Sequence, residues 1–479
     1  MSQKADLCFA VPSFRAHVQS AEAAHPRIGE AASAAMAPGV VDVMGGICED
    51  GGSILVTAPL DACVRAACWR IAGKNLVIRL HGPGKDAPAR EFAISFDQLP
   101  AVAASNGDAS AWFEKSGAQW ATSACLAVGR LIADGIMPAS PDGLMVLLQS
   151  DFPDESDLGS PCTTAAAVIE AVTQYLGAQV ELLKKATLAT AAASPLTGVE
   201  RLRIAVTALS GAATGSFLQL RFVPQFSCDP LPLPDGITIA AVRTVLGRPT
   251  TLDRIVETRT CAEMGARMIL DLRRQDAPAL DAKGIHLAAI SPSDYVDRYR
   301  DRLPSKITAK AFVSRFGDIR GLNGQADGKS VFKVRSRAEH HIYENRRVHD
   351  FATNIARARR LGAAEALVHA GELMYASHWS HSQRCGIGGV EADKLVGAIR
   401  RRGAPEGLYG AKVTGGGNGG ELVVLMRDDD RAYAALRAAV LETEAETGKA
   451  VAIFMATHAR KESAAAPKVA DTLGAAAGV

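Results

Sequence analysis

Short apolar runs predict several strands in the first part of the chain. Residues 53–80 hold three such runs, S-I-L-V-T-A-P-L, A-A-C-W-R-I-A and N-L-V-I-R-L, whose composition is typical of strands. Glycines flank a proline at 82–84, which predicts a turn. The run G-L-M-V-L-L-Q-S at 143–150 predicts a buried strand. The Ala-rich first 30 residues predict an arm or a first strand.

Apolar residues recur at helical spacing in four longer segments. These segments are residues 117–135, 163–182, 251–275 and 339–375. A Pro-rich stretch at 224–238 predicts the boundary between an α/β lobe and a mixed α+β lobe. We therefore expect an N-terminal arm (1–30), an N-terminal domain (31–230), a C-terminal domain (231–465) and a flexible tail (466–479).

Composition narrows the class of protein. The chain has 479 residues, 48% hydrophobic and 22% charged, as expected of a globular protein with more than one lobe. A net charge of +2 argues against a nucleic-acid-binding protein. No apolar stretch reaches the roughly 18 residues that span a membrane, and the N-terminus lacks the apolar core of a secretory signal. We expect a cytoplasmic protein without a membrane partner.

Cysteine spacing gives no sign of a metal or redox centre. The nine cysteines are scattered, and no C-x-x-C pair occurs. Such cysteines are expected to be reduced and mostly buried.

The sharpest local signal is the glycine run K-V-T-G-G-G-N-G-G-E-L-V-V-L-M at 412–426. Glycine permits positive φ and close approach of the backbone to a ligand, so the run predicts either a phosphate cradle or a flexible hairpin loop. The string G-A-K-V-T-G-G-G-N-G-G at 410–420 resembles the third motif of the GHMP small-molecule kinases, G-A-K-x-T-G-x-G-x-G-G. The resemblance implies nucleotide contacts from Gly415, Gly416, Gly417 and Gly419.

A second segment resembles the first GHMP motif in its arabinokinase form. Residues 37–53 read A-P-G-V-V-D-V-M-G-G-I-C-E-D-G-G-S, against A-P-G-R-x-D-V-M-G-G-I-A-D in that branch. The resemblance implies sugar-binding carboxylates at Asp42, Glu49 and Asp50, whereas a purely structural interpretation is a polar turn between two strands. Val40 replaces the arginine that the family carries near the transferred phosphate, and valine donates no hydrogen bond from its side chain.

The middle motif of the family, P-x-G-x-G-L-[SG]-S-S-A, appears in altered form. Residues 153–167 read P-D-E-S-D-L-G-S-P-C-T-T-A-A-A, with Pro161 and Cys162 inserted before the expected helix. Acids at 154, 155 and 157 replace small residues where a triphosphate is expected, and like charges there oppose binding.

The resemblance still implies specific contacts in this middle region. It implies nucleotide binding by Gly159, Ser160, Thr163 and Thr164, and magnesium binding by Ser160 and Glu170. A solvated helix face is the alternative interpretation of Glu170.

The catalytic base of the family has no clear counterpart. Galactokinases and arabinokinases carry C-G-x-M-D-Q, and the best match, S-G-A-A-T-G at 210–215, puts Thr214 at the aspartate position. Threonine is not a general base near neutral pH. Asp229 is the nearest downstream acid, in a setting that predicts a loop. The catalytic residues are therefore not assigned.

Two segments of the second lobe separate the galactokinase-like branch from mevalonate and homoserine kinases. Residues 337–351, R-A-E-H-H-I-Y-E-N-R-R-V-H-D-F, resemble R-x-H-x-I-Y-E-N-x-R-V, and residues 374–389 resemble the S-H-x-S run. We expect His340, His341 and His378 to serve in helix packing with paired ring nitrogens, and assign them no metal.

The resemblance spans residues 30–465 and implies a two-lobed fold, with a ribosomal-protein-like α/β N-terminal lobe and a GHMP α+β C-terminal lobe. It implies an ATP- and magnesium-dependent kinase that phosphorylates the anomeric hydroxyl of a monosaccharide. Because the arginine and aspartate of the family are replaced, we expect weak activity. One alternative is a catalytically impaired homologue that binds a sugar or phosphosugar as a sensor or partner subunit. A further alternative is a different GHMP-type chemistry on a substrate that brings its own phosphate.

Overall fold

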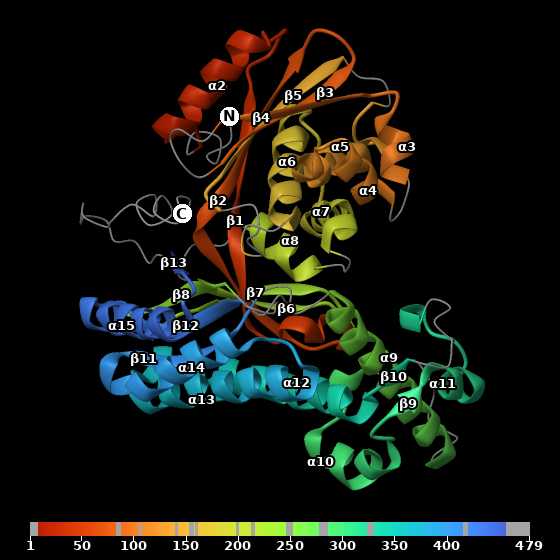
Figure 1. The fold of residues 1–479 in the computed structure, drawn as a ribbon, viewed down its shortest axis with the longest axis vertical. Helices are drawn as coiled ribbons and strands as arrows, with labels where there is room; N and C mark the ends of the chain where they lie inside the picture. Colours follow the sequence, from red (N-terminus) through yellow and green to blue (C-terminus); the bar gives the residue numbers. More distant parts are fainter. Residues whose placement is uncertain are drawn as a thin grey trace. The chain divides into compact units, whose positions relative to one another are not determined.

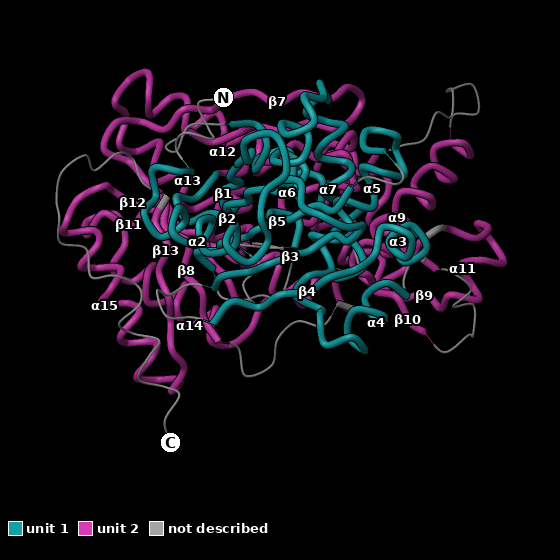
Figure 2. Tube along the Cα trace, turned by 90° about the horizontal axis from the view of Figure 1, so that it is seen from above, with its two compact units in different colours: residues 1–40, 59–214, 457–479 teal, residues 41–58, 215–456 magenta. Residues whose placement is uncertain are grey.

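The computed structural model describes most of the chain. The described residues are 8–82, 88–104, 108–138, 142–152, 158, 161–197, 201–211, 216–245, 252–276, 286–322, 330–414 and 420–456. The chain forms two compact units, shown in different colours in Figure 2: unit 1 contains residues 1–40, 59–214 and 457–479, and unit 2 contains residues 41–58 and 215–456. The units alternate along the sequence, and the linear domain boundaries remain a prediction.

Two strands begin in one unit and end in the other. β1 spans Ser33–Met44 and β2 spans Leu55–Ile71. The two strand-like runs expected before residue 72 are this one continuous strand, β2. Most of β2 is buried on both faces, so its sequence is apolar without the alternation that would mark one exposed side.

The sheet of unit 1 places its strands in the order β4-β3-β5-β2, and β1 also pairs with β2. β5 is the predicted strand at Gly143–Ser150. It pairs antiparallel with β2 and parallel with β3 (Asn75–His81), which forms a hairpin with β4 (Arg90–Ser95).

One face of this sheet is covered by α2 (Pro12–Ala24), so this part of the first 30 residues is a helix and the expectation of a strand there is wrong. Phe14, Val18 and Ala21 fall on one side of the helix at helical spacing and pack in one apolar cluster with Trp69. Pro12 occupies the first turn, where its missing N–H costs no helical hydrogen bond.

Helices cover the other face of the same sheet (Figure 1). They are α3 (Leu99–Ala104), α4 (Asp108–Lys115), α5 (Thr122–Ala133), α6 (Pro161–Tyr175), α7 (Leu182–Thr197) and α8 (Leu202–Leu209). The helix predicted at 163–182 is α6, which ends at Tyr175 before α7 begins. Pro161 and Cys162 are not an insertion before the helix, because they form its first turn.

Unit 2 contains a four-stranded antiparallel sheet in the order β11-β12-β8-β13. Its strands are β8 (Ile237–Thr244), β11 (Leu408–Val413), β12 (Glu421–Arg427) and β13 (Val451–Ala456). Residues of α13 (Ala364–Ser380), α14 (Val390–Arg402) and α15 (Asp430–Thr447) form one apolar cluster with alternate residues of the strands. These helices therefore pack on one face of the sheet.

The long helices of unit 2 follow the predicted periodicity. α9 (Leu252–Asp276) matches the helix expected at 251–275. The pattern at 339–375 is two helices, α12 (Val334–Leu361) and α13, because Gly362 ends the first with a φ of 62° that favours glycine. A second apolar cluster joins α9 and α12 to a small subdomain of α10 (Pro292–Asp294), α11 (Ala309–Phe316) and the pair β9 (Ile307–Thr308) and β10 (Val331–Phe332).

Unit 2 also holds the hairpin of β6 (Ser216–Arg221) and β7 (Ser227–Pro232), and β6 pairs with the first residues of β2. Asp229 lies in β7 rather than in the loop that its neighbours predicted. None of the described helices is long and apolar enough to cross a membrane.

Candidate functional site

The first and third sequence motifs meet inside unit 2. Asp42, near the end of β1, is 1% exposed. Its backbone N–H donates to Thr414 Oγ1 over 2.7 Å, although the two residues lie 372 positions apart. Thr414 directly follows β11, and its own N–H donates to Glu421 O over 2.8 Å. The residue preceding the glycine run is therefore fixed against Asp42.

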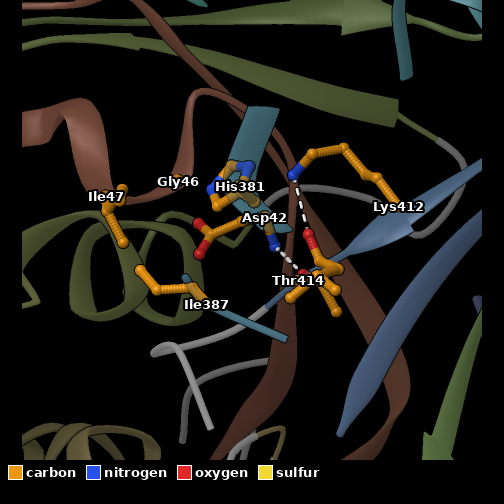
Figure 3. Close-up of a pocket in the computed structure, with 8 residues that line it drawn as sticks. Asp42, Gly46, Ile47, His381, Ile387, Lys412 and Thr414 are labelled. Carbon is orange, nitrogen blue, oxygen red and sulfur yellow. Dashed lines mark hydrogen bonds between the residues drawn. The ribbon is translucent and has the colours of Figure 1, made fainter. Parts of the chain in front are cut away.

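A small niche lies beside this contact (Figure 3). It is lined by Asp42, Gly46, Ile47, His381, Ile387, Lys412, Val413 and Thr414. Its volume, counted for the centre of a water-sized sphere, is ≈ 10 Å³. This is room for roughly one water molecule or hydroxyl group. The niche thus combines a carboxylate, an imidazole and an ammonium group around a space that fits one small polar group.

Two charged side chains in and near the niche, those of Lys412 and Glu344, are fully buried. Lys412 is fully buried, and its Nζ donates to Val413 O over 2.8 Å. Glu344 on α12 is also fully buried and accepts from Ser377 Oγ at 2.6 Å and from Arg347 at 2.8 Å. Burial alone would raise the pKa of Glu344, but the positive charge of Arg347, with smaller effects from Lys412 and from the hydrogen bond of Ser377, outweighs it and leaves the pKa lowered.

The segment after β1 is held at both ends by α12. Gly45 N–H donates to Glu344 Oε1 at 3.3 Å, before the short 3₁₀ helix η1 (Gly46–Gly51). Beyond that helix, Asn345 Oδ1 accepts from Ser53 Oγ at 3.1 Å and from Ile54 N–H at 3.2 Å. The Glu-Asn pair of the I-Y-E-N segment thus positions the first motif. The resemblance of residues 337–351 to the family segment pointed to these two residues, but the sequence did not indicate that they position the first motif.

Three histidines cluster beside the niche. His340 Nδ1 lies 2.9 Å from Ser380 Oγ, and its ring stands edge-on to His381 with centroids 4.5 Å apart. His341 Nδ1 lies 2.9 Å from Arg337 O. Burial lowers the pKa of all three rings, that of His381 to about 3, with further lowering of the His381 pKa by Lys412. His340 and His341 are buried as the expected packing role requires, but Nε2 of each ring has no hydrogen-bond partner among the described residues, so the expectation that both ring nitrogens would be paired is wrong. His381 was not singled out from the sequence.

His378 makes two polar contacts within unit 2. Its Nδ1 accepts from Val413 N–H at 3.4 Å, and its Nε2 faces Asp393 Oδ1 at 3.0 Å. The ring links α13 to β11 and α14, as its predicted packing role requires. No group of three or more His, Cys, Asp or Glu side chains among the described residues is arranged to hold a metal ion.

The other two predicted sugar carboxylates lie on η1, away from the buried niche. Glu49 is partly buried. Asp50 is about half exposed, and its Oδ2 pairs with Arg259 Nε on α9 at 3.0 Å. The structure therefore divides the three predicted carboxylates into one buried acid, Asp42, and two more accessible ones.

Four of the residues singled out from the sequence lie in the described part of unit 1: Val40, Thr163, Thr164 and Glu170. Val40 is 1% exposed, and its N–H donates to Leu158 O at 3.3 Å. Thr163 and Thr164 lie in the first turn of α6. Glu170, two turns later, accepts from Lys185 at 2.8 Å and from Gln174 at 2.9 Å. Other predicted residues lie outside the described part of the chain: Gly159, Ser160, Thr214, Gly415, Gly416, Gly417 and Gly419.

Comparison with known proteins supports the resemblance read from the motifs. No family model matches the chain. It is 24% identical over 480 residues to an L-arabinokinase of Arabidopsis thaliana, a match that covers 88% of this chain and 45% of the relative. The chain thus spans about half the length of that relative.

Two solved structures share the fold. Lactococcus lactis galactokinase complexed with galactose superposes with a TM-score of 0.65 at 18% identity, covering 92% of this chain and 97% of that one. Methanococcus jannaschii mevalonate kinase gives 0.53 at 12% identity, covering 89% and 99%. The predicted fold class is confirmed: the chain has the fold of these kinases.

Proposed function

We propose that this chain, which is a GHMP-superfamily protein similar to galactokinases and arabinokinases, acts as a sugar kinase. It would transfer a phosphoryl group from ATP to the anomeric hydroxyl of a monosaccharide. The observation that carries the proposal is the contact between Asp42 and Thr414, which joins the sugar-side first motif to the residue preceding the glycine run. A buried carboxylate beside a polar niche is well suited to bind a sugar hydroxyl.

The described residues fit this reaction in part. Asp42 places a carboxylate, which can accept from a sugar hydroxyl, and Lys412 a positive charge in the same niche. The N-terminus of α6, with Thr163 and Thr164 in its first turn, is a favourable end for phosphate oxygens because its N–H groups and dipole attract anions. ATP and Mg²⁺ would supply the transferred group and neutralise its charge.

Slow turnover follows from the same residues. Val40 is buried and apolar where related kinases carry an arginine, so it adds no hydrogen bond to the transferring group. Loss of one preorganised donor typically slows turnover by about 100- to 1000-fold. Glu170 would also have to release Lys185 before it could bind magnesium. These features are the observations behind the second candidate function, a homologue that binds a sugar or phosphosugar as a sensor or partner subunit with little catalysis.

Calorimetry and a coupled ADP-release assay test both functions on the full chain. L-arabinose and D-galactose are the first probes, each titrated with and without Mg·ATP. We expect sugar binding, nucleotide binding that requires magnesium, and turnover well below an ordinary kinase rate of about 1–100 per second. Binding without turnover would select the second function, and a protein that binds no sugar would refute both. Asp42→Asn should abolish sugar binding in the same titrations.

A further inference from the structure

His381 stands at a special place in the chain. It begins the short π-helix η7 (His381–Cys385), which continues α13, and its ring lines the niche together with Asp42. Figure 3 shows the Asp42 carboxylate and the His381 imidazole adjacent to one another in that niche. Asp42 comes from β1 and His381 from the end of α13, so two distant parts of unit 2 supply acceptor groups to one small space.

The hydrogen-bond partner of His381 fixes its tautomer. Nδ1 lies 3.1 Å from Ser377 O, and a carbonyl oxygen only accepts, so Nδ1 carries the proton. In the neutral ring Nε2 then presents a lone pair.

Protonation of the second nitrogen is opposed by the surroundings. The charged or titratable groups near the ring are Asp42 on β1, Lys412 on β11, Glu344 and His340 on α12, and His378 on α13. Burial and Lys412 lower the pKa of His381 to about 3, against the smaller raising effect of Glu344. His381 is therefore a neutral acceptor across the physiological range.

The backbone in front of Nε2 leaves it room. A Cβ built on Gly46 would stand 3.5 Å from His381 Nε2, which is ordinary contact distance, so any side chain there would occupy the approach to the lone pair. Gly46 also has a φ of 43°, a conformation that favours glycine. The first motif thus places a residue without a side chain directly opposite the imidazole.

We propose that His381 is a specificity-determining residue of the sugar site, whose Nε2 accepts the hydrogen bond of the one monosaccharide hydroxyl that the niche admits, beside the carboxylate of Asp42. The inference rests on the proposed sugar-binding function. A niche with room for one hydroxyl and an imidazole acceptor at its wall matches a single hydroxyl of an aldose, which has one hydrogen to donate. Such a site rejects a sugar that lacks the hydroxyl, because the analogue leaves a buried acceptor unpaired.

Two other roles fit the same atoms less well. A divalent cation would have to lie close to the buried ammonium of Lys412, and like charge opposes that. A general base needs a pKa near the working pH, and the pKa of His381 lies far below it. The ring is therefore an acceptor that orients a hydroxyl rather than one that removes its proton.

The experiment compares sugars with their deoxy analogues on three proteins. The affinities of D-galactose, L-arabinose and the monodeoxy analogues of each are measured by calorimetry on wild type, His381→Leu and His381→Gln. In wild type, one deoxy position should bind about 10-fold more weakly than the parent sugar, the equivalent of one hydrogen bond. In His381→Leu the penalty at that position alone should vanish. His381→Gln, whose side-chain oxygen keeps an acceptor, should preserve most of it.

His340→Gln is the matched control, because His340 is equally buried in the same cluster but does not line the niche. It should leave every deoxy penalty unchanged, and thermal melts establish that each variant is folded. If wild type binds an aldose and both His381 variants show the wild-type pattern of penalties, the role of His381 is refuted while the sugar-binding function stands. If wild type binds none of the sugars, both proposals fail. If His381→Leu does not fold, the test rests on wild type and His381→Gln. Equal affinity penalties for all deoxy positions in wild type, with the same pattern in His381→Gln, would then overturn the inference.

Discussion

The two units bury different kinds of polar groups. Among the described residues, the buried carboxylates of Asp42, Glu344 and Glu421 and the buried ammonium of Lys412 all belong to unit 2. The buried polar residues described in unit 1 are mostly hydroxyl-bearing: Thr122, Ser123, Thr163, Thr173, Thr190 and Thr207, with His81, Arg201 and Arg203. The described part of unit 2 therefore buries carboxylates as well as cations, whereas the buried charges described in unit 1 are the two guanidinium groups of Arg201 and Arg203. Burial of a charge costs desolvation free energy unless the charge is paired.

The partners of these groups differ as well. In unit 1, Thr173 donates to Ile169 O and Thr207 to Arg203 O, each one turn back in its own helix. In unit 2, Glu344 reaches Ser377 and Gly45, which lie far away in the sequence. Local hydroxyl contacts add little constraint, whereas the long-range charged contacts fix several elements at once. Such a preorganised, costly polar interior is what a binding site requires.

Removing Glu344 should have the largest effect on stability. Glu344→Leu leaves Arg347, Ser377 and Gly45 without their shared acceptor, and breaking a buried ion pair typically costs about 3–5 kcal/mol. Thr173→Val in unit 1 loses only a contact within one helix, worth about 1 kcal/mol. Urea unfolding measures both free energies. Equal losses would show that the contrast between the two interiors has no energetic meaning.

A charge introduced into unit 1 should be the next most costly change. Val40→Arg restores the arginine of the related kinases but places it at a position that is 1% exposed. We expect a loss of about 2–3 kcal/mol, since a larger and charged side chain must enter packed apolar surroundings. Val40→Met is the control for size, because it adds length without charge. If the arginine variant is as stable as the methionine variant and turns over ATP faster, position 40 faces the nucleotide after all.

The buried histidines predict a dependence of stability on pH. The folded-state pKa is depressed to about 3 for His381 and to about 4 for His81, and well below normal for His340, in each case first through burial. Between those values and the unfolded pKa of about 6.5 the unfolded chain binds more protons. Their stabilising contribution is therefore complete above pH 6.5 and is lost as the pH falls toward the folded pKa.

Single substitutions measure how much of this loss of stability comes from a histidine in each unit. Each such histidine contributes a slope of about 1.4 kcal/mol per pH unit within its window. His340→Gln should remove one such slope from unit 2, and His81→Gln one from unit 1, in urea unfolding measured between pH 7 and pH 4.5. An unchanged slope in either variant would mean that its ring is protonated in the folded state.

The sequence predicted local structure better than the site. The strand at 143–150 and the helix at 251–275 follow from apolar runs and spacing that each segment carries by itself. The fold class followed from motifs in their correct order. The arrangement of Asp42 against Thr414, and of Glu344 against Gly45, depends on contacts between residues hundreds of positions apart, which no local pattern encodes.

Single residues show the same limit. No local pattern marks His381, because its proposed role depends on the carbonyl oxygen of Ser377 at Nδ1 and on Gly46 opposite Nε2. The helix α2 was missed because its apolar face consists of only three widely spaced buried side chains in an Ala-rich segment.

The smallest effect on stability is expected at Asp50, and it separates binding from folding within unit 2. Asp50 is about half exposed and pairs with Arg259, and exposed ion pairs contribute about 0–1 kcal/mol. Asp50→Ala and Glu49→Ala should therefore leave the free energy of unfolding nearly unchanged, in contrast to Glu344→Leu. Both should weaken the binding of the best aldose by about 10-fold if these carboxylates accept sugar hydroxyls, each worth about one hydrogen bond. Calorimetry on folded variants decides the matter, with Asp430→Ala on the distant α15 as a control for loss of a negative charge. If both variants bind sugar with wild-type affinity, Asp42 is the one predicted carboxylate of the first motif that contacts the sugar. The contribution of this motif to sugar binding would then come from the buried interior of unit 2 alone.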